Sequence, residues 1–325
     1  MSKQLRFDEY LEDALYGEQG FYSTVGRAGR RGDFITSPEV GPLFGAVLAR
    51  WIDAEFNRLG QPGDFRVVEV GAGPGTLARA ILHAAPQWTG RYIAVEISPA
   101  QRATHPDGVE SIAALEGEPF RGVVIANELL DNLPFRLAVF DGGWREAVVD
   151  VADSGELHEH LVEPPKEWTW LPERAPHGAR VPIQQRAATW VTEVRAQLAA
   201  GTLLAFDYFT ALTAELASVP WREWLRTYSG HERGEHYLRN HGLQDITAQV
   251  CLDQLPPPSS VHSQAQFLSR WGIDELVAEG RAHWSAEVAA PSLETFRMRS
   301  RIREAESLLD PAGLGTFLAV EWAVL

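Results

Sequence analysis

The first sixty residues carry hydrophobic side chains at helical spacing, interrupted by one polar loop. Residues 24–34 read TVGRAGRRGDF, a composition rich in Gly and Arg that is typical of a loop. After the loop, Ser37 can cap a helix and Pro38 suits its first turn. Hydrophobic residues then recur every three or four positions, which predicts one helix from Ser37 to Gly60. We therefore expect a helical N-terminal extension over residues 1–60.

From residue 65 the pattern changes to short apolar strands separated by helical segments. The strands read FRVVEVG, RYIAVEI and RGVVIAN, and the helices between them read TLARAILHAA and PAQRATH. Strands that alternate with helices indicate a parallel sheet covered on both faces. This part of the chain therefore predicts an α/β, Rossmann-like fold with a mostly parallel central sheet.

The middle of the chain adds further elements to this plan. Residues 136–151 alternate around a DGG turn, which predicts a hairpin inserted into the sheet, and residues 163–176 are a loop rich in Pro and Trp. Residues 182–201 predict a helix that stops at a glycine, and residues 202–208 predict a buried strand after it.

The last part of the chain begins with the proline-rich break LPPPSS at 255–260. Two or three helices follow, and the apolar run over 315–325 predicts a closing strand of the sheet. We expect three parts: the helical N-terminal extension, a Rossmann-like core with hairpin and loop insertions over 61–254, and helices with a closing strand packed on the core over 255–325.

Composition narrows the classes of function. The 325 residues are 45% hydrophobic, so the chain can bury a large core, and the net charge is −15 with a pI near 5.1. This acidity argues against a nucleic-acid partner, because that binding depends on clustered Lys and Arg. The one cysteine, Cys251, excludes an internal disulfide and fits a reducing compartment. With no signal-peptide core and no apolar run long enough to span a bilayer, we expect a cytoplasmic protein that does not bind membranes.

A glycine-rich turn carries the first chemical signal. VVEVGAGPGTLARAIL places three glycines, beginning at Gly71, between a strand and a helix, where the backbone can approach a ligand closely. Glu96 ends the next strand, where a carboxylate can accept both ribose hydroxyls of an adenosine. The G-x-G-x-G spacing, with Glu69 two residues earlier, favours S-adenosylmethionine over a dinucleotide, which prefers G-x-G-x-x-G. A dinucleotide and a purely structural turn remain the alternatives.

The order of several motifs is the second signal. The sequence contains ALYGEQGFYS, GDFITSPEVGPLFG, EVGAGPGTLARAIL, NELLDNLPF, FDYF, LRTYSGH, GLQDIT and QAQFLSRWGI in this order. It resembles the MidA family, which includes mitochondrial protein arginine methyltransferases that act as complex I assembly factors. The resemblance implies a class I methyltransferase fold, S-adenosylmethionine as cofactor and an arginine of a partner protein as acceptor. Two departures, Phe209 in place of a glycine and His241 in place of a proline, lie near the expected substrate entrance.

The resemblance also implies a set of cofactor-binding residues. They are Gly32, Asp33, Thr36, Glu69, Gly71, Ala72, Gly73, Glu96, Ile97 and Asn127. In this family the GDFITSPE segment forms a lid over the cofactor, whereas for Ser37 an ordinary helix cap explains the residue equally well.

The NELLDNLPF motif supplies the candidate catalytic residues. Methyl transfer from a sulfonium is an in-line displacement, so the protein mainly aligns and desolvates the nucleophile. A guanidinium presents a planar fork of donors that carboxylates can hold. We expect Asn127 beside the methyl donor and Glu128, with Asp131 as second candidate, paired with the guanidinium. The alternative is that both acids only cap a short helix that begins there.

Substrate contacts are expected at Asp207 and Tyr208, which end a buried strand, and at His231 in a polar loop. Three histidines in this region are spaced five apart, which fits no metal motif, so we predict no metal site. The leading interpretation is a protein arginine methyltransferase. A methyltransferase of small molecules and an assembly factor that binds the cofactor without turnover are the alternatives.

Overall fold

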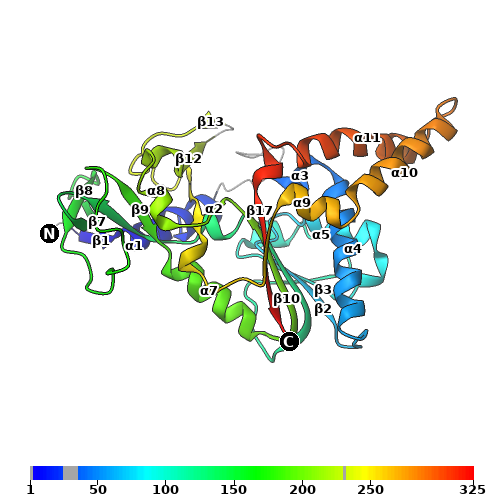
Figure 1. The fold of residues 1–325 in the computed structure, drawn as a ribbon, viewed down its shortest axis with the longest axis horizontal. Helices are drawn as coiled ribbons and strands as arrows, with labels where there is room; N and C mark the ends of the chain where they lie inside the picture. Colours follow the sequence, from blue (N-terminus) through cyan, green and yellow to red (C-terminus); the bar gives the residue numbers. More distant parts are fainter. Residues whose placement is uncertain (1–2, 25–35, 230–231) are drawn as a thin grey trace.

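The computed structural model describes residues 3–24, 36–229 and 232–325, and its centre is a seven-stranded sheet (Figure 1). The strand order is β16-β17-β10-β5-β2-β3-β4, and only β17 runs antiparallel to its neighbours. The strands are β2 (Arg66–Val70), β3 (Tyr92–Val95), β4 (Val109–Ile112), β5 (Phe120–Asn127), β10 (Leu198–Asp207), β16 (Ser260–Ser263) and β17 (Leu318–Val324). The predicted α/β fold with a mostly parallel sheet is confirmed, as is the closing strand near the C-terminus.

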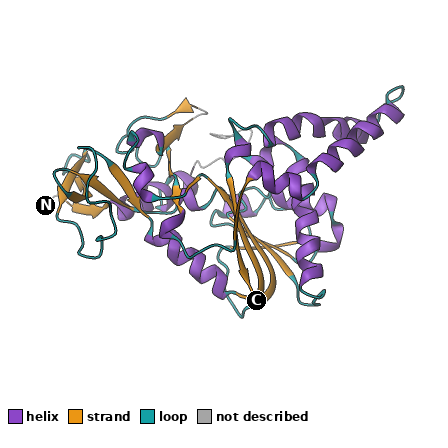
Figure 2. Cartoon of the chain, viewed as in Figure 1, coloured by secondary structure: helices purple, strands orange, loops and turns teal. Residues whose placement is uncertain are grey.

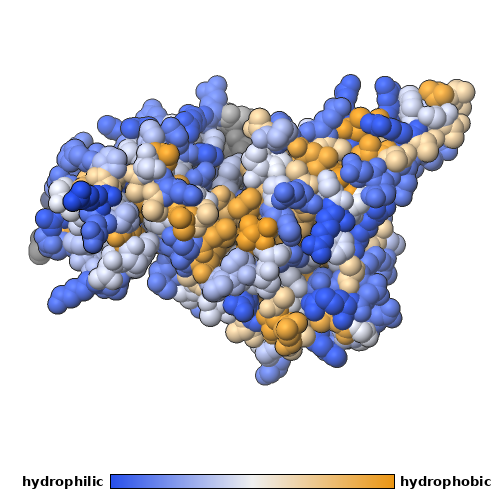
Figure 3. Space-filling model, viewed as in Figure 1, coloured by the Kyte–Doolittle hydropathy of each residue, from blue (hydrophilic) through white to orange (hydrophobic). Residues whose placement is uncertain are grey.

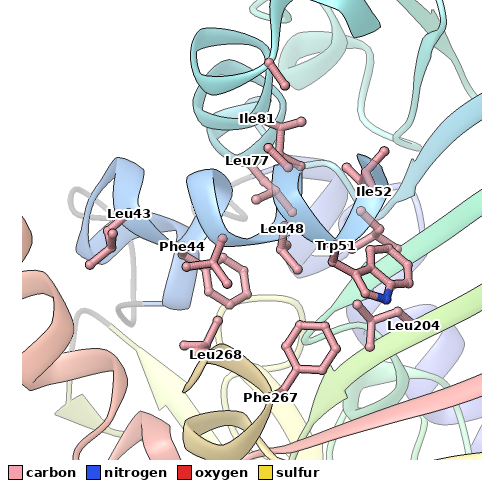
Figure 4. Close-up of a cluster of buried hydrophobic side chains, with 14 of the residues drawn as sticks. Leu43, Phe44, Leu48, Trp51, Ile52, Leu77, Ile81, Leu204, Phe267 and Leu268 are labelled. Carbon is pink, nitrogen blue, oxygen red and sulfur yellow. The ribbon is translucent and has the colours of Figure 1, made fainter. Parts of the chain in front are cut away.

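Helices cover both faces of this sheet. The reason is that its central strands present apolar side chains to each face in turn. Val67, Val123 and Ile125 pack with α4 (Pro42–Arg58) and α5 (Thr76–Ala84), and Figure 4 shows how these two helices bury Leu and Ile side chains against each other. Val68 and Val124 pack on the other face with α7 (Gln185–Ala196). The central strands β2, β3, β5 and β10 therefore read as nearly continuous apolar runs, as strands of a covered parallel sheet do, whereas the edge strands β4 and β16 do not.

A second, antiparallel sheet forms the lobe at the left of Figure 1. It contains β1 (Lys3–Arg6), β6 (Arg136–Phe140), β7 (Trp144–Val151), β8 (Leu157–Val162) and β9 (Arg180–Ile183), and α1 (Phe7–Tyr16) packs on it. The predicted hairpin over 136–151 is confirmed as β6 and β7, but it lies in this separate sheet. β1 has no counterpart in the prediction, because its pairing with β7 joins residues far apart in sequence.

The predicted helix from Ser37 to Gly60 is interrupted. A single turn, α3 (Ser37–Val40), ends at Gly41, and α4 begins at Pro42. The residue before a proline disfavours helical backbone. In addition, a Cβ on Gly41 would lie 2.3 Å from the Glu304 carboxyl carbon, and that carboxylate accepts a hydrogen bond of 2.8 Å from the Leu43 backbone N–H. A distant glutamate therefore caps α4.

Three further differences concern element ends. The helix predicted over 182–201 ends at Ala196, and β10 begins at Leu198. Gly201 lies inside β10, where its Cβ would stand 1.7 Å from the Gly122 carbonyl oxygen, so this glycine permits close strand approach and does not stop a helix. The helix predicted in PAQRATH is one turn, α6 (Pro99–Arg102), and β4 follows it unpredicted.

The remaining elements surround these sheets. They are α2 (Phe21–Thr24), α8 (Thr213–Leu216), α9 (Gln264–Arg270), α10 (Ile273–Glu287), α11 (Leu293–Leu308), β11 (Phe209–Thr210), β12 (Leu225–Ser229), β13 (Glu232–Arg233), β14 (Asp245–Ala248) and β15 (Val250–Cys251). Figure 2 shows helices on both sides of the central sheet, and α10 and α11, labelled in Figure 1, project from the body of the molecule as a hairpin.

The hairpin exposes large hydrophobic residues, among them Leu293, which is 82% exposed, and Phe296, which is 52% exposed. In Figure 3 hydrophobic residues appear on the hairpin, near the centre and at the lower edge of the visible face, while the antiparallel lobe is mostly hydrophilic. Within residues 3–24, 36–229 and 232–325, no helix combines the length and the apolar composition needed to cross a bilayer. The division of the chain at residues 60 and 254 stays a prediction. Both sheets draw strands from across these boundaries, through β1 and through β16 and β17.

Candidate functional site

A cavity of about 780 Å³ lies at the carboxyl ends of β2, β3 and β5. Open α/β sheets bind ligands at this edge, because helix N-termini and loop backbones converge there. Side chains from α7 also line the cavity, among them Arg186 and Trp190, and so do side chains from α1 and α2. The candidate site therefore lies between the carboxyl edge of the central sheet and helices α1, α2 and α7.

The glycine-rich turn forms one wall of the cavity. Gly71, Gly73 and Gly75 all have left-handed backbone, with φ of 71°, 52° and 80°. Residues with a Cβ adopt this region rarely, which explains three glycines within five positions. Gly75 is also the N-cap of α5, so the turn delivers the start of that helix to the cavity.

Two buried glutamates stand behind the turn. Glu96 accepts a hydrogen bond of 2.9 Å from the Gly73 N–H and one of 2.8 Å from the Ser98 N–H, which ties the second strand end to the turn. Each carboxylate oxygen retains a further acceptor site, so Glu96 can still bind a hydroxyl. Glu69 accepts a hydrogen bond of 2.7 Å from the Tyr92 hydroxyl, and burial raises the pKa of Glu69 to about 8. Both glutamates line the cavity.

The turn after β5 presents the second wall. Asn127 and Glu128 line the cavity, and Glu128 has a left-handed backbone with φ of 51°. A residue with a side chain is uncommon there and persists only where its surroundings impose it. The Glu128 N–H donates to the Phe206 carbonyl oxygen at 2.8 Å, so the neighbouring strand holds this conformation in place.

The electrostatics of Glu128 follow from burial. Loss of solvent and the nearby Asp131 carboxylate together raise the pKa of Glu128 to about 8, against hydrogen bonds from the Asn127 side chain and the Ser37 backbone. The Asn127 Nδ2 donates to Glu128 Oε1 at 3.1 Å, while the buried Asn127 Oδ1 has no hydrogen-bond partner among the described residues. The cavity therefore offers an acidic side chain and an unfilled amide acceptor next to each other.

Asp131, Asp207 and Tyr208 do not line the cavity, and their predicted roles toward the substrate stay predictions. Asp131 is 4% exposed and accepts a hydrogen bond from the Thr247 hydroxyl. Burial raises the pKa of Asp131 to about 6. Tyr208 packs its ring against Phe317.

Asp207 is fully buried. Its carboxylate accepts hydrogen bonds from the backbone N–H groups of Leu130, at 2.9 Å, and Asp131, at 3.3 Å. The helix that begins after Glu128 is one 3₁₀ turn over Leu130–Asn132, and no side chain caps it in the ordinary manner. Its first N–H groups are satisfied by Asp207 from the next strand. Asp131 lies in the first turn, as the helix-cap alternative expects, so that alternative stays a prediction for this residue. Asp207 positions the turn that carries Glu128.

The lid segment is described only in part. Gly32, Asp33 and His231 lie outside the described residues, whereas Thr36 lines the cavity. Ser37 is the first residue of α3 and does not cap it, because its hydroxyl donates to the Gln264 Oε1 at 2.8 Å. The helix-cap explanation for Ser37 is thus wrong.

Several lining residues were missing from the prediction. Tyr16 and Tyr22 come from the quoted ALYGEQGFYS motif, whose tyrosines received no role. Residues 113–115 follow β4, a strand that the apolar pattern did not reveal because it is only half buried. The departures Phe209 and His241 do not line the cavity, although we expected them near the substrate entrance.

Comparison with known proteins places this site in a family. Residues 47–267, more than half of the chain, match the profile of a family described as "Putative S-adenosyl-L-methionine-dependent methyltransferase". The chain belongs to this family. A crystal structure of a Burkholderia thailandensis protein bound to S-adenosyl-homocysteine is 26% identical, has a TM-score of 0.83, and is matched over 99% of this chain and 88% of that one. The family, the fold and S-adenosylmethionine as the cofactor are thereby confirmed, and the chain is a methyltransferase.

Curated relatives carry more specific names. "Protein arginine methyltransferase NDUFAF7 homolog, mitochondrial" from Drosophila melanogaster is 33% identical over 46% of this chain and 42% of its own length. "Protein arginine methyltransferase NDUFAF7, mitochondrial" from Danio rerio is 26% identical over 82% of this chain and 72% of its own length. The cytoplasmic location expected from the sequence is contradicted, because these relatives are named as mitochondrial proteins.

The residues of the cavity fit S-adenosylmethionine. Eight predicted cofactor residues are described, and all eight line this one cavity: Thr36, Glu69, Gly71, Ala72, Gly73, Glu96, Ile97 and Asn127. The unfilled Asn127 Oδ1 can accept a donor such as the cofactor ammonium, and the Glu96 oxygens can accept ribose hydroxyls. When bound, this cofactor supplies an activated methyl group. The individual contacts remain predictions.

Proposed function

We propose that this methyltransferase transfers the methyl group of S-adenosylmethionine to an arginine side chain of a partner protein. The names of the curated relatives support arginine as the acceptor. The observation that carries the proposal is the position of Glu128, a carboxyl held in left-handed backbone on the cavity wall next to Asn127.

The chemistry of the transfer explains why a carboxylate belongs there. The bond between the methyl carbon and the sulfonium sulfur breaks, and its electron pair stays on the sulfur, which becomes the thioether of S-adenosyl-homocysteine. A bond to a guanidinium nitrogen forms, and the proton that this nitrogen loses passes to solvent. Glu128, once ionised, pairs with the guanidinium and turns one nitrogen toward the methyl group. Within the described residues no Lys or Arg forms an ion pair with Glu128, so its charge is available to an incoming cation.

The neutral state of Glu128 is part of this proposal. With its pKa near 8, the empty site holds Glu128 largely protonated at neutral pH. An arriving guanidinium favours the ionised form, because an opposite charge within about 4–6 Å lowers a carboxyl pKa by about 1–3 units. Binding a cationic acceptor therefore creates the charge that orients it.

The test uses proteins from a strain that lacks this chain. The purified enzyme and cofactor carrying a radioactive methyl group are added to a lysate of that strain, and labelled proteins are hydrolysed to amino acids. We expect label in methylarginine, and Glu128→Gln is expected to lose most of it while still binding cofactor in calorimetry. Label in methyllysine or in small molecules would refute the proposal, and the exposed Glu118→Gln serves as the matched control.

A further inference from the structure

Two tyrosines from the N-terminal segment line the same cavity as Glu128. Tyr16 ends α1 and Tyr22 lies in α2, and their rings stack with centroids 5.6 Å apart and an angle of 17° between planes. Both side chains are partly buried. Stacked rings of this kind form a stable flat surface, since offset stacking is a preferred aromatic arrangement.

The hydroxyls of this pair are already committed to the protein. Tyr16 donates to the Asn132 carbonyl oxygen at 3.1 Å, and Tyr22 donates to the Asp245 Oδ1 at 3.0 Å. Asn132 Nδ2 donates to the same Asp245 oxygen at 2.9 Å, so one buried carboxyl ties α2 to the turn that carries Glu128. What the tyrosine pair offers the cavity is therefore aromatic surface.

The surroundings of the pair are acidic. Glu12 lines the cavity beside Tyr16, and the buried Asp245 leaves its Oδ2 without a hydrogen-bond partner among the described residues. In the described part of the chain no Lys or Arg forms an ion pair with Glu12, Glu128 or Asp245. Aromatic surface next to carboxyl groups that no Lys or Arg neutralises favours a cation, because its arrival also favours their ionised form. A planar cation gains most from a flat wall.

We propose that Tyr16 and Tyr22 form the wall against which the planar guanidinium of the acceptor lies, and that this wall selects arginine over lysine. The inference rests on the proposed function and adds the residues that determine its specificity. A guanidinium stacks on an aromatic face and is weakly hydrated, whereas an ammonium is a compact, strongly hydrated charge. Asp245 is a positioning residue that acts by holding Tyr22.

The test compares Tyr22→Leu, which removes the ring, with Tyr22→Phe, which keeps it. The acceptor is a synthetic peptide copied from the protein segment labelled in the lysate, made with arginine or with lysine at the methylated position. Trp170→Leu is the control, because Trp170 is 46% exposed and does not line the cavity. Calorimetry with S-adenosyl-homocysteine and the melting temperature establish that each variant is folded.

For Tyr22→Leu we expect KM for the arginine peptide to rise about 5- to 30-fold, the range of a partly desolvated cation–π contact. We expect kcat to stay within about 3-fold and the preference for arginine over lysine to shrink by the same factor as kcat/KM, because the stacking contact is made in the ground state as well as in the transition state. Tyr22→Phe and Trp170→Leu should keep the wild-type KM. Should Tyr22→Leu fail to fold, Tyr16→Leu carries the same expectation.

The outcomes separate the two proposals. If the wild type methylates arginine and folded Tyr22→Leu retains its KM and its preference, the tyrosine wall is refuted and the proposed function stands. If the wild type methylates lysine or a small molecule instead, the proposed function is refuted and the inference falls with it.

Discussion

Replacing Glu128 with Gln is expected to stabilise the cofactor-free protein at alkaline pH while it removes activity. Burial raises the pKa of Glu128 from 4.5 to about 8, so the folded state holds its proton more tightly than the unfolded state. The stability linked to this group is fully present below pH 4.5 and is lost as pH rises through 8. Glutamine fits the same space and never ionises.

The magnitude follows from the two pKa values. A rise from 4.5 to about 8 corresponds to at most about 5 kcal/mol of unfolding free energy well above pH 8. Because Glu128 borders a cavity and retains some access to solvent, we expect about 2–4 kcal/mol. Burial also raises the pKa of Asp245, to about 7. Ionisation of Asp245 at alkaline pH therefore lowers the stability of the wild type and of Glu128→Gln alike.

Urea denaturation of wild type and Glu128→Gln at pH 5 and pH 8.5, without cofactor, measures this difference. The variant should differ little from the wild type at pH 5 and gain about 2–4 kcal/mol relative to it at pH 8.5. The exposed Glu118→Gln makes the same change in net charge and should show no such gain. An equal effect of Glu128→Gln at both pH values would show that the carboxyl is not held protonated by burial.

Three other variants test the rest of the site. Gly71→Ala should weaken cofactor binding in calorimetry and cost about 1–2 kcal/mol of stability. Gly71 has φ of 71°, and a Cβ at this position would meet the Leu129 side chain at 3.0 Å. Unchanged affinity would contradict a close approach of this turn to the cofactor. Glu96→Ala should raise the cofactor Kd about 10-fold or more through lost acceptor sites, and a wild-type Kd would remove Glu96 from the site. Asp207→Asn should lower kcat and leave the cofactor Kd near the wild-type value, since Asp207 orders the turn that carries Glu128 and does not line the cavity; a large loss of cofactor affinity in a folded variant would oppose that role.

The cofactor half of the cavity was predictable from local patterns. Three glycines in five positions indicate a tight turn of the backbone. An acidic residue at the end of the following strand indicates a carboxylate close to that turn. Both features need only a strand, a turn and a helix in succession, because parallel strands bring their carboxyl ends to one edge. The prediction of Glu69, Gly71 and Glu96 on one cavity wall therefore required no knowledge of distant contacts.

The acceptor half was not predictable in the same way, because contacts between distant segments create it. Tyr22 meets Asp245 across 223 positions, and Asp207 reaches the turn after β5 across 77 positions. No local pattern reveals such pairs, so the sequence did not indicate that Asp207 accepts hydrogen bonds from this turn.

The sequence by itself determined the strands β2, β3, β5, β10 and β17 of the central sheet, the tight glycine turn after β2, and the cofactor that this turn suits, because each depends on neighbouring residues. Only the tertiary structure decided that Gly41 breaks a helix against Glu304, that β1 joins the antiparallel sheet, and that two tyrosines stand beside Glu128. The physical reason is the separation along the sequence of the residues that interact. Backbone conformation and burial periodicity depend on adjacent residues, whereas these packing contacts exist only once the remote segments have folded against each other.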